Sequence, residues 1–368
     1  MMGDRVNDGR SLILSGNTSY KNLTGVMVTG RIQVITSSSI SALEKSQKII
    51  ESISTNPINT YAQVRPNPTP ANVDDAFSQI RNFDPRVIVA IGGGSVIDFA
   101  KVISARLANS EISTTNELIS NRTLKAKSVQ LVAIPTTSGT GSEVTPFATL
   151  WLETGIGKTS IESDELIPDI ALLDGELSKS ASPDQLLFSG LDAISHCVET
   201  LWNRHRTPQS EMYAIQGLTE ILGSFPRILS GSGTDNDYQT MQIAAMHGGL
   251  AISKNHTALA HAMSYPLTAY FGVPHGLACS FTIPAIWGMF REHFGDRSEA
   301  NKLIVQTCDL LSENDLLKRV NRWINVDEAL KLSHLMSNSE RSGNFICDIQ
   351  ISDIENILNR SFALTEIL

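Results

Sequence analysis

Four side chains in the second half of the chain could together bind a divalent metal ion. Asp192 and His196 are four residues apart in a stretch with helical character, so both would lie on one face of a helix. Alone, such a pair is more typical of a helix-surface hydrogen bond than of a metal site. His261 and His275, however, bracket an apolar segment with few other polar anchors. A buried histidine must be hydrogen-bonded or bind a metal, and three imidazoles with one carboxylate suit Fe²⁺ or Zn²⁺.

The cysteines do not enter this candidate metal set. No Cys-x-x-Cys spacing occurs among the four of them, which excludes a disulfide framework and a thiolate zinc site. We interpret Cys197 and Cys279 as small core residues, although both stand near the candidate ligands in sequence. The absence of cysteine from the set argues against a structural zinc site. The other histidines are interpreted as surface or packing residues, with His256 ambiguous: His205, His247, His293 and His334.

A glycine-rich turn in the first half could hold a phosphate. The buried strand predicted at 86–91 runs directly into Gly92, Gly93, Gly94 and Ser95, and a helix follows. Backbone N–H groups and a helix N-terminus in that geometry bind anions. Glycine permits close approach, and we expect it to supply positive φ in part of the turn, with Ser95 capping the helix. Without further support, a tight turn that binds nothing is an equal alternative.

A second loop favours the nucleotide interpretation. Residues 136–142 (Thr-Thr-Ser-Gly-Thr-Gly-Ser) follow another predicted strand, 129–134. Nucleotides bind at the carboxyl edge of open α/β sheets, where both loops would lie. The glycine turn differs from the usual Gly-x-Gly-x-x-Gly fingerprint, so an ordinary Rossmann assignment would be wrong in detail.

The elements that must position these residues predict two domains. Strands predicted at 31–36, 60–65, 86–91 and 129–134 alternate with helices near 42–53, 71–80 and 95–107, which indicates a parallel sheet covered by helices. A hairpin is predicted over 144–151 and 158–161. From Pro183 onward long helical periodicities replace the strands, ending in a helix over 351–363. We therefore predict a Rossmann-like α/β dinucleotide-binding domain over 1–180 and an all-helical metal-binding domain over 181–368.

Composition excludes several classes of protein. The 368 residues are 41% hydrophobic and carry a formal charge of −9, which excludes a disordered chain and disfavours a nucleic-acid partner. No apolar run has the length of a signal peptide or a membrane span. We therefore expect no membrane association and a cytoplasmic location.

Four motifs in this order resemble the iron-containing (group III) alcohol dehydrogenases. They are Ile91–Asp98, Pro135–Val144, Gly190–His196, and His261 with Pro274-His275-Gly276. The resemblance implies a dehydroquinate synthase-like fold with the active site in a cleft between an α/β domain and a helical domain. It implies that the metal ligands are Asp192, His196, His261 and His275.

The same resemblance implies a nicotinamide cofactor and a reaction. The residues that would contact the dinucleotide are Gly92, Gly93, Gly94, Ser95, Thr136, Thr137, Thr140 and Ser142, with Asp98 and Lys158 nearby. The implied reaction is reversible hydride transfer between nicotinamide C4 and an aldehyde carbon. The cation polarises the carbonyl oxygen and stabilises the developing alkoxide.

Three departures from the family pattern refine this expectation. Many members end the strand corresponding to 31–36 in an aspartate that binds the adenosine ribose, whereas this chain has Thr36-Ser37-Ser38-Ser39, so we favour NADPH over NADH. A histidine often found four residues after the third ligand is Tyr265, so a proton relay would use Tyr265, His256 or water.

The third departure is a lysine shortly before His261. Lys254 stands where small or amide residues are usual. Facing the cleft it would suit an anionic substrate, and a solvated lysine is the equal alternative. With the run from His261 to Pro266, it resembles the subgroup that reduces phosphonoacetaldehyde to 2-hydroxyethylphosphonate in phosphonate biosynthesis.

Other interpretations stay open at this point. A general short-chain alcohol dehydrogenase is the nearest alternative. A lyase like dehydroquinate synthase, which uses NAD without net redox change, and a binding protein that has lost the chemistry are the others. A homodimer is the default expectation for the assembly.

Overall fold

The computed structural model describes residues 4–6, 9–121, 123–153, 157–337 and 339–363. Contacts within the chain divide it into two compact units, residues 1–181 and 182–368. The boundary predicted after residue 180 lies one residue from this division.

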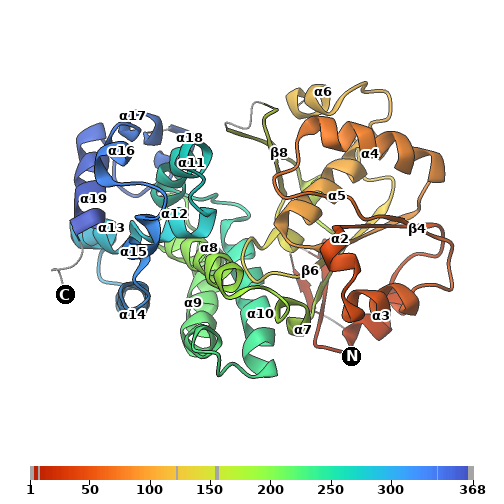
Figure 1. Ribbon diagram of the computed structural model, residues 1–368, viewed down its shortest axis with the longest axis horizontal. Coiled ribbons are helices and arrows are strands. Elements are labelled where there is room, and N and C mark those ends of the chain that lie inside the picture. Colours follow the sequence, from red (N-terminus) through yellow and green to blue (C-terminus); the bar gives the residue numbers. More distant parts are fainter. Residues whose placement is uncertain (1–3, 7–8, 122, 154–156, 338, 364–368) are drawn as a thin grey trace. The chain divides into compact units, whose positions relative to one another are not determined.

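The first unit is built on a sheet of seven described strands (Figure 1). Their order is β1-β2-β9-β6-β5-β3-β4, and every pairing is parallel except that of β1 with β2. The chain moves outward from β3 to β4 and then crosses to β5 on the other side of β3. Open α/β sheets bind nucleotides at such a reversal, at the carboxyl ends of the strands. The strands are β1 (Asp4–Val6), β2 (Ser11–Ser15), β3 (Ile32–Thr36), β4 (Ile58–Tyr61), β5 (Val87–Gly92), β6 (Gln130–Pro135) and β9 (Ile170–Leu173).

Helices cover both faces of this sheet. Because side chains alternate along a strand, Ile88 and Ala90 of β5 pack into one apolar cluster, and Val87 and Val89 into another. The first cluster includes residues of α4 (Pro70–Phe83), α5 (Gly94–Ala108) and α6 (Thr115–Ser120). The second includes residues of α1 (Leu23–Val26), α3 (Glu44–Ser52) and α7 (Gly175–Ser178). The predicted α/β class is confirmed.

A separate antiparallel hairpin packs beside α5. Its strands are β7 (Phe147–Trp151) and β8 (Lys158–Glu162), close to the predicted ones. The turn residues 154–156 lie outside the described residues. The short helices of this unit are α2 (Ser38–Ser41), η1 (Ser19–Asn22), η2 (Ser142–Val144) and η3 (Asp164–Leu166).

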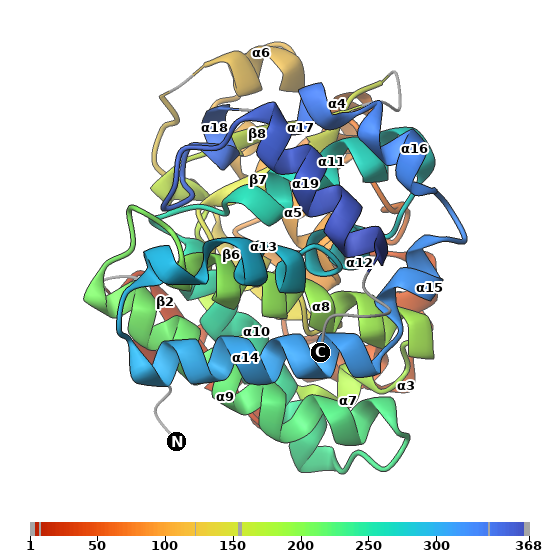
Figure 2. The same cartoon turned by 90° about the vertical axis from the view of Figure 1, so that its left-hand side faces the viewer.

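The second unit is helical, as predicted. Its described part holds no strand pairing beyond one bridge between Asn203 and Phe345. Figure 2 shows α14 lying along α9, and α8, α9 and α10 pack against one another. The helices are α8 (Pro183–Leu201), α9 (Pro208–Leu229), α10 (Asp235–Ile252), α11 (Leu259–Phe271), α12 (His275–Ser280), α13 (Ile283–Phe290), η4 (Arg291–Phe294), α14 (Ser298–Glu313), α15 (Leu316–Val320), α16 (Val326–Leu330), α17 (Ser333–Met336), α18 (Ser339–Ser342) and α19 (Ile351–Ala363).

Local sequence explains where the long helices begin. Ser182 accepts a hydrogen bond from the backbone N–H of Gln185, and Pro183 opens α8. Thr207 with Pro208 and Thr234 act in the same way for α9 and α10. None of the described helices is both long enough and apolar enough to cross a bilayer.

Candidate active site

Three helices of the second unit bring the candidate metal ligands together. Asp192 and His196 lie one turn apart on α8, His261 lies on α11, and His275 is the first residue of α12. Close packing fixes α12 against α8. A Cβ at Gly276 would lie 1.9 Å from the carbonyl oxygen of Phe188, so only glycine permits this approach.

The three imidazoles surround one carboxylate oxygen. The distances from Asp192 Oδ1 to the Nε2 atoms are 3.7 Å for His196, 3.6 Å for His261 and 4.0 Å for His275. Ligand atoms bound about 2.1 Å from a tetrahedral ion lie about 3.4 Å from one another. These distances to Asp192 are close to what one shared ion requires, and they are too long for direct hydrogen bonds. His196 meets Asp192 at this distance but does not belong to the group whose potential ligand atoms all lie within 4.8 Å of one another.

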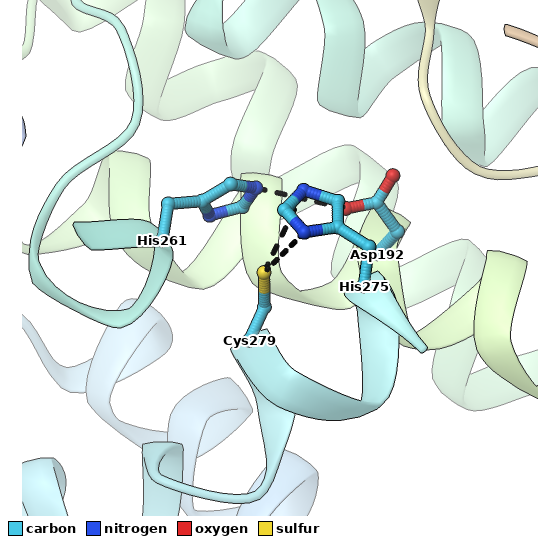
Figure 3. Close-up of side chains that lie close together, drawn as sticks. All are labelled: Asp192, His261, His275 and Cys279. Carbon is cyan, nitrogen blue, oxygen red and sulfur yellow. Dashed lines mark hydrogen bonds and ion pairs between the residues drawn. The ribbon is translucent and has the colours of Figure 1, made fainter. Parts of the chain in front are cut away.

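Cys279 also lies in this cluster, which corrects its interpretation as a core residue only. Its Sγ is 3.8 Å from Nδ1 and 3.9 Å from Nε2 of His275. One potential ligand atom from each of Asp192, His261, His275 and Cys279 lies within 4.8 Å of the others. Figure 3 shows the sulfur, the two rings and the carboxylate converging. The helix periodicity could have indicated this, because Cys279 follows His275 by one turn of α12.

Burial and charge support a cation at this place. Asp192 is 6% exposed and His261 is 2% exposed. Among the described residues, Asp192 Oδ1 and His261 Nε2 have no hydrogen-bond partner, which is costly for buried polar atoms unless a ligand is bound. Burial lowers the pKa of His261, but its neighbours Cys279, Glu199 and Asp192 outweigh that effect and raise the pKa well above its ordinary value. A set of nitrogen, oxygen and sulfur donors fits Fe²⁺ or Zn²⁺.

A buried carboxylate that the sequence interpretation missed supports the same cluster. Glu199 is fully buried on α8, and its Oε2 lies 2.5 Å from His261 Nδ1. Burial raises the pKa of Glu199, whereas His261 and two backbone N–H groups lower it and prevail, so the group is a carboxylate. Its spacing from Asp192 and His196 places all three on one face of α8, and this was the available indication in the sequence.

The residues proposed near the substrate lie on α11 and in the turn before it. The Tyr265 ring is parallel to that of His275, with centroids 5.8 Å apart. His256 adopts a left-handed backbone with φ of 58°. Lys254 is exposed, whereas its neighbours Ser253 and Asn255 are buried.

In the first unit the glycine turn lies at the carboxyl end of β5. The reason why glycine is required there differs from the prediction. None of Gly92, Gly93 and Gly94 has positive φ, and α5 is capped by Gly93 rather than Ser95. Space is what requires glycine. A Cβ at Gly92 would lie 2.5 Å from Val96 Cβ, and one at Gly94 would lie 2.7 Å from Thr140 Cγ2.

The second loop packs against this turn. The backbone N–H of Thr136 donates to the carbonyl of Gly92 at 3.1 Å, and a Cβ at Gly93 would lie 3.2 Å from Thr137 Oγ1. Thr140 is exposed, whereas Thr136 is 3% and Ser142 4% exposed. The two loops therefore form one surface, to which the accessible members can present hydroxyl and N–H groups.

Two further candidates for cofactor contact flank this surface. Ser37 follows β3 and accepts a hydrogen bond from the backbone N–H of Ile40, which caps α2. Thr36 Oγ1 donates to the carbonyl of Ile91 at 2.7 Å and joins the ends of β3 and β5. Lys158 begins β8, and its Nζ lies 5.1 Å from the centroid of Trp151.

Comparison with models of protein families shows to which family the chain belongs. The model described as iron-containing alcohol dehydrogenase matches residues 11–175, and that of the family's C-terminal domain matches residues 186–356. The chain belongs to the iron-containing alcohol dehydrogenase family. It is therefore an oxidoreductase of the alcohol dehydrogenase and aldehyde reductase type, which confirms the resemblance.

Several relatives of this alcohol dehydrogenase have names that specify an activity. It is 32% identical to the probable alcohol dehydrogenase EutG of Escherichia coli, over 69% of this chain and 67% of that protein. It is 32% identical to phosphonoacetaldehyde reductase of Streptomyces viridochromogenes, over 62% and 59%. It is 31% identical to 4-hydroxybutyrate dehydrogenase of Cupriavidus necator, over 69% and 68%.

Solved structures share the fold over nearly the whole of this alcohol dehydrogenase. A crystal structure of an iron-containing alcohol dehydrogenase superposes with a TM-score of 0.82 at 25% identity, covering 99% of this chain and 100% of that one. The structure of sulfoacetaldehyde reductase from Bifidobacterium kashiwanohense in complex with NAD⁺ gives 0.86 at 22% identity, with coverage of 99% and 100%.

Proposed function

We propose that this enzyme reduces a short aldehyde with an anionic group at its far end to the primary alcohol, with phosphonoacetaldehyde as the first substrate to test. The observation that supports aldehyde reduction is that three imidazole Nε2 atoms lie within 4.0 Å of Asp192 Oδ1, and the anionic group is argued separately from Lys254. A general short-chain alcohol dehydrogenase is the alternative that the experiment below distinguishes.

Residues Asp192, His196, His261 and His275 would hold Fe²⁺ or Zn²⁺. When bound, such an ion polarises the carbonyl oxygen of the aldehyde and stabilises the alkoxide. The chain supplies the orientation, because the ligands stand on three packed helices rather than on loops. Tyr265 is held beside His275 by ring stacking, and its phenol is our candidate proton donor to the alkoxide.

We infer that NADPH is the preferred reductant. The residues that follow β3 offer hydroxyl groups at Ser37, Ser38 and Ser39, with no carboxylate to repel a 2′-phosphate. Ser38 and Ser39 are exposed. The glycine turn and the loop 136–142 would hold the pyrophosphate at the neighbouring strand ends.

The anionic end of the substrate is inferred from Lys254 and from the relatives. The turn that contains Lys254 leads within a few residues to Ala258, the N-cap of α11, and so to His261. An exposed ammonium at this point would attract a phosphonate, sulfonate or carboxylate. Three of the similar proteins are named for substrates with such groups: phosphonoacetaldehyde, 4-hydroxybutyrate and sulfoacetaldehyde.

The test compares aldehydes that differ in the charge at the far end. The protein is reconstituted with Fe²⁺ or Zn²⁺, and kcat/KM is measured for phosphonoacetaldehyde, succinic semialdehyde and butanal with NADPH and with NADH. Each assay is repeated with Lys254→Ala and with Lys302→Ala, an exposed lysine on α14 that serves as the matched control.

We expect phosphonoacetaldehyde with NADPH to give the highest kcat/KM. A charge-assisted hydrogen bond is worth roughly 1.5–3 kcal/mol, so Lys254→Ala should lower this value about 10- to 100-fold, with a smaller loss for butanal. Lys302→Ala should match the wild type. Equal rates for charged and uncharged aldehydes, or equal losses in Lys254→Ala, would support a general alcohol dehydrogenase instead.

A further inference from the structure

Glu199 makes three hydrogen bonds to the start of α11. Its Oε1 accepts from the backbone N–H of His261 at 3.1 Å, and its Oε2 accepts from the backbone N–H of Ala258 at 3.1 Å. The same Oε2 lies 2.5 Å from His261 Nδ1. Glu199 is completely buried, so its charge must be compensated by these groups.

These contacts replace a cap that α11 lacks. Ala258 is the N-cap residue of α11 and has no side chain that could accept a hydrogen bond. A carboxylate at a helix N-terminus satisfies unpaired N–H groups and interacts favourably with the helix dipole. Asn203 reinforces the arrangement, because its Nδ2 donates to the carbonyls of Asn255 and His256 at 2.8 and 3.2 Å.

The hydrogen bond between Glu199 and His261 Nδ1 determines which ring nitrogen of His261 is available to bind a metal. A carboxylate only accepts hydrogen bonds, so Nδ1 of His261 carries a proton and donates to Glu199. Nε2, which is 3.6 Å from Asp192 Oδ1, is then the ring nitrogen that faces the cluster and can bind a metal. Metal-binding histidines are oriented in this manner by outer carboxylates, whose loss typically weakens metal binding about 10- to 100-fold.

We propose that Glu199 is a positioning residue of the metal centre, which holds the first turn of α11 in place and fixes the His261 ring so that Nε2 faces Asp192. This inference rests on the proposed function, because it requires that His261 binds a metal. In this proposal one face of α8 carries two ligands, Asp192 and His196. The same face carries Glu199, which supports the third ligand, His261.

The decisive variant is Glu199→Gln, which keeps the size of the side chain but replaces one acceptor by a donor. If the amide nitrogen takes the place of Oε1, it faces the N–H of His261. If it takes the place of Oε2, it faces the N–H of Ala258 and donates to His261 Nδ1, which moves the ring proton to Nε2. In either orientation an N–H group of the amide faces a backbone N–H group, so the variant cannot reproduce the wild-type arrangement.

The controls separate positioning from general stability. Glu199→Asp keeps two acceptors on a shorter side chain and should recover part of the metal affinity. Glu220→Gln is the control, because Glu220 Oε2 lies 2.8 Å from His247 Nδ1 in a partly buried carboxylate–imidazole pair between α9 and α10. Neither Glu220 nor His247 belongs to the metal cluster.

The experiment measures metal binding without turnover. Dissociation constants for Zn²⁺ and the visible spectrum of bound Co²⁺ are recorded for the four proteins, with thermal unfolding of the metal-free forms alongside. We expect Glu199→Gln to bind Zn²⁺ about 10- to 100-fold more weakly with an altered Co²⁺ spectrum. Glu220→Gln should match the wild type in both.

The outcomes distinguish the two proposals. Wild-type protein that binds no divalent ion overturns the proposed function, and this inference with it. Unchanged Zn²⁺ affinity and Co²⁺ spectrum in Glu199→Gln overturn the inference alone. If that variant does not fold, the ¹⁵N spectrum of Zn²⁺-loaded wild type decides, because a proton on Nδ1 of His261 supports the inference and coordination through Nδ1 overturns it.

Discussion

Asp98 accepts a hydrogen bond from Ser142 Oγ at 2.5 Å and thereby joins α5 to the loop that follows β6. Its second oxygen accepts from the backbone N–H of Thr149 on β7 at 3.0 Å. Asp98 and Ser142 were expected near the cofactor as individual contacts. Their mutual hydrogen bond also fixes the loop after β6 against α5, and so it helps to set the shape of the surface that the glycine turn and the threonine loop present.

Removal of the Asp98 carboxylate should weaken dinucleotide binding. Asp98→Ala leaves the Ser142 hydroxyl and the Thr149 N–H without their acceptor, at a cost of about 1–3 kcal/mol. We expect a higher KM for NADPH and a lower thermal midpoint. Asp98→Asn should retain most of both, because the amide can donate to Ser142 and accept from Thr149. Equal KM values for Asp98→Ala and wild type would contradict this role.

Gly94 should tolerate no larger side chain. In Gly94→Ala the new Cβ would lie 2.7 Å from Thr140 Cγ2, so the threonine loop must shift. We expect a raised dissociation constant for NADPH, measured by quenching of protein fluorescence. Gly223→Ala provides the contrast, since a Cβ there meets nothing within 4 Å inside α9 and should stabilise the fold by roughly 0.5–1 kcal/mol. A Gly94→Ala variant with unchanged cofactor affinity would refute the steric argument.

Cys279 should influence which metal is retained. Its sulfur is the soft donor of the cluster, and soft donors favour Zn²⁺ over Mn²⁺. We expect Cys279→Ala to lower the affinity for Zn²⁺ more than that for Mn²⁺ in competition titrations. Cys197→Ala, a fully buried cysteine of α8, controls for the loss of packing. Parallel losses for both ions in Cys279→Ala would show that the sulfur does not select the metal.

Glu143 should make stability depend on pH. Burial raises its pKa to about 7 from an ordinary value of 4.5, against the opposing effects of a backbone N–H and Lys101. Since the folded pKa is the higher one, the group contributes stability that is full below pH 4.5 and is lost as the pH rises through about 7. The thermal midpoint of Glu143→Gln should therefore fall less than that of wild type between pH 4.5 and 7.

Lys101 allows the source of this effect to be checked. Burial lowers the pKa of Lys101 from 10.5 to about 8, so its contribution is present above pH 10.5 and lost as the pH falls through about 8. The interval below pH 7 therefore excludes the titration of Lys101, and other acids that titrate there are present in both proteins. Midpoints that run parallel for wild type and Glu143→Gln there would contradict the assignment.

The central strands were predictable because they are buried on both faces. β5 and β6 are continuous apolar runs, and the structure places each within one residue of the prediction. β4 is an edge strand with exposed Asn59 and Thr60, and it covers 58–61 rather than 60–65. The helix expected over 42–53 is α3, which covers 44–52 and begins after Leu43 takes an extended backbone.

Other features depend on partners far away in the chain. β2 and β9 are short, and their pairing joins residues near position 13 to residues near 171, so neither strand was predicted. The apolar segment around His261 indicated a ligand, but the capping of α11 by Glu199 depends on residues 62 apart in sequence. Helix periodicity predicts on which face of α8 Glu199 lies, but it does not predict which element packs against that face.

The division of the chain after residue 181 also separates the two chemistries. The candidate cofactor contacts lie before it, from Ser37 to Lys158, and the candidate metal ligands lie after it, from Asp192 to His275. Mutations that change the choice of reductant therefore need not disturb the metal, and the two properties can evolve independently. A recombination event near this division would exchange one specificity as a block and preserve the other.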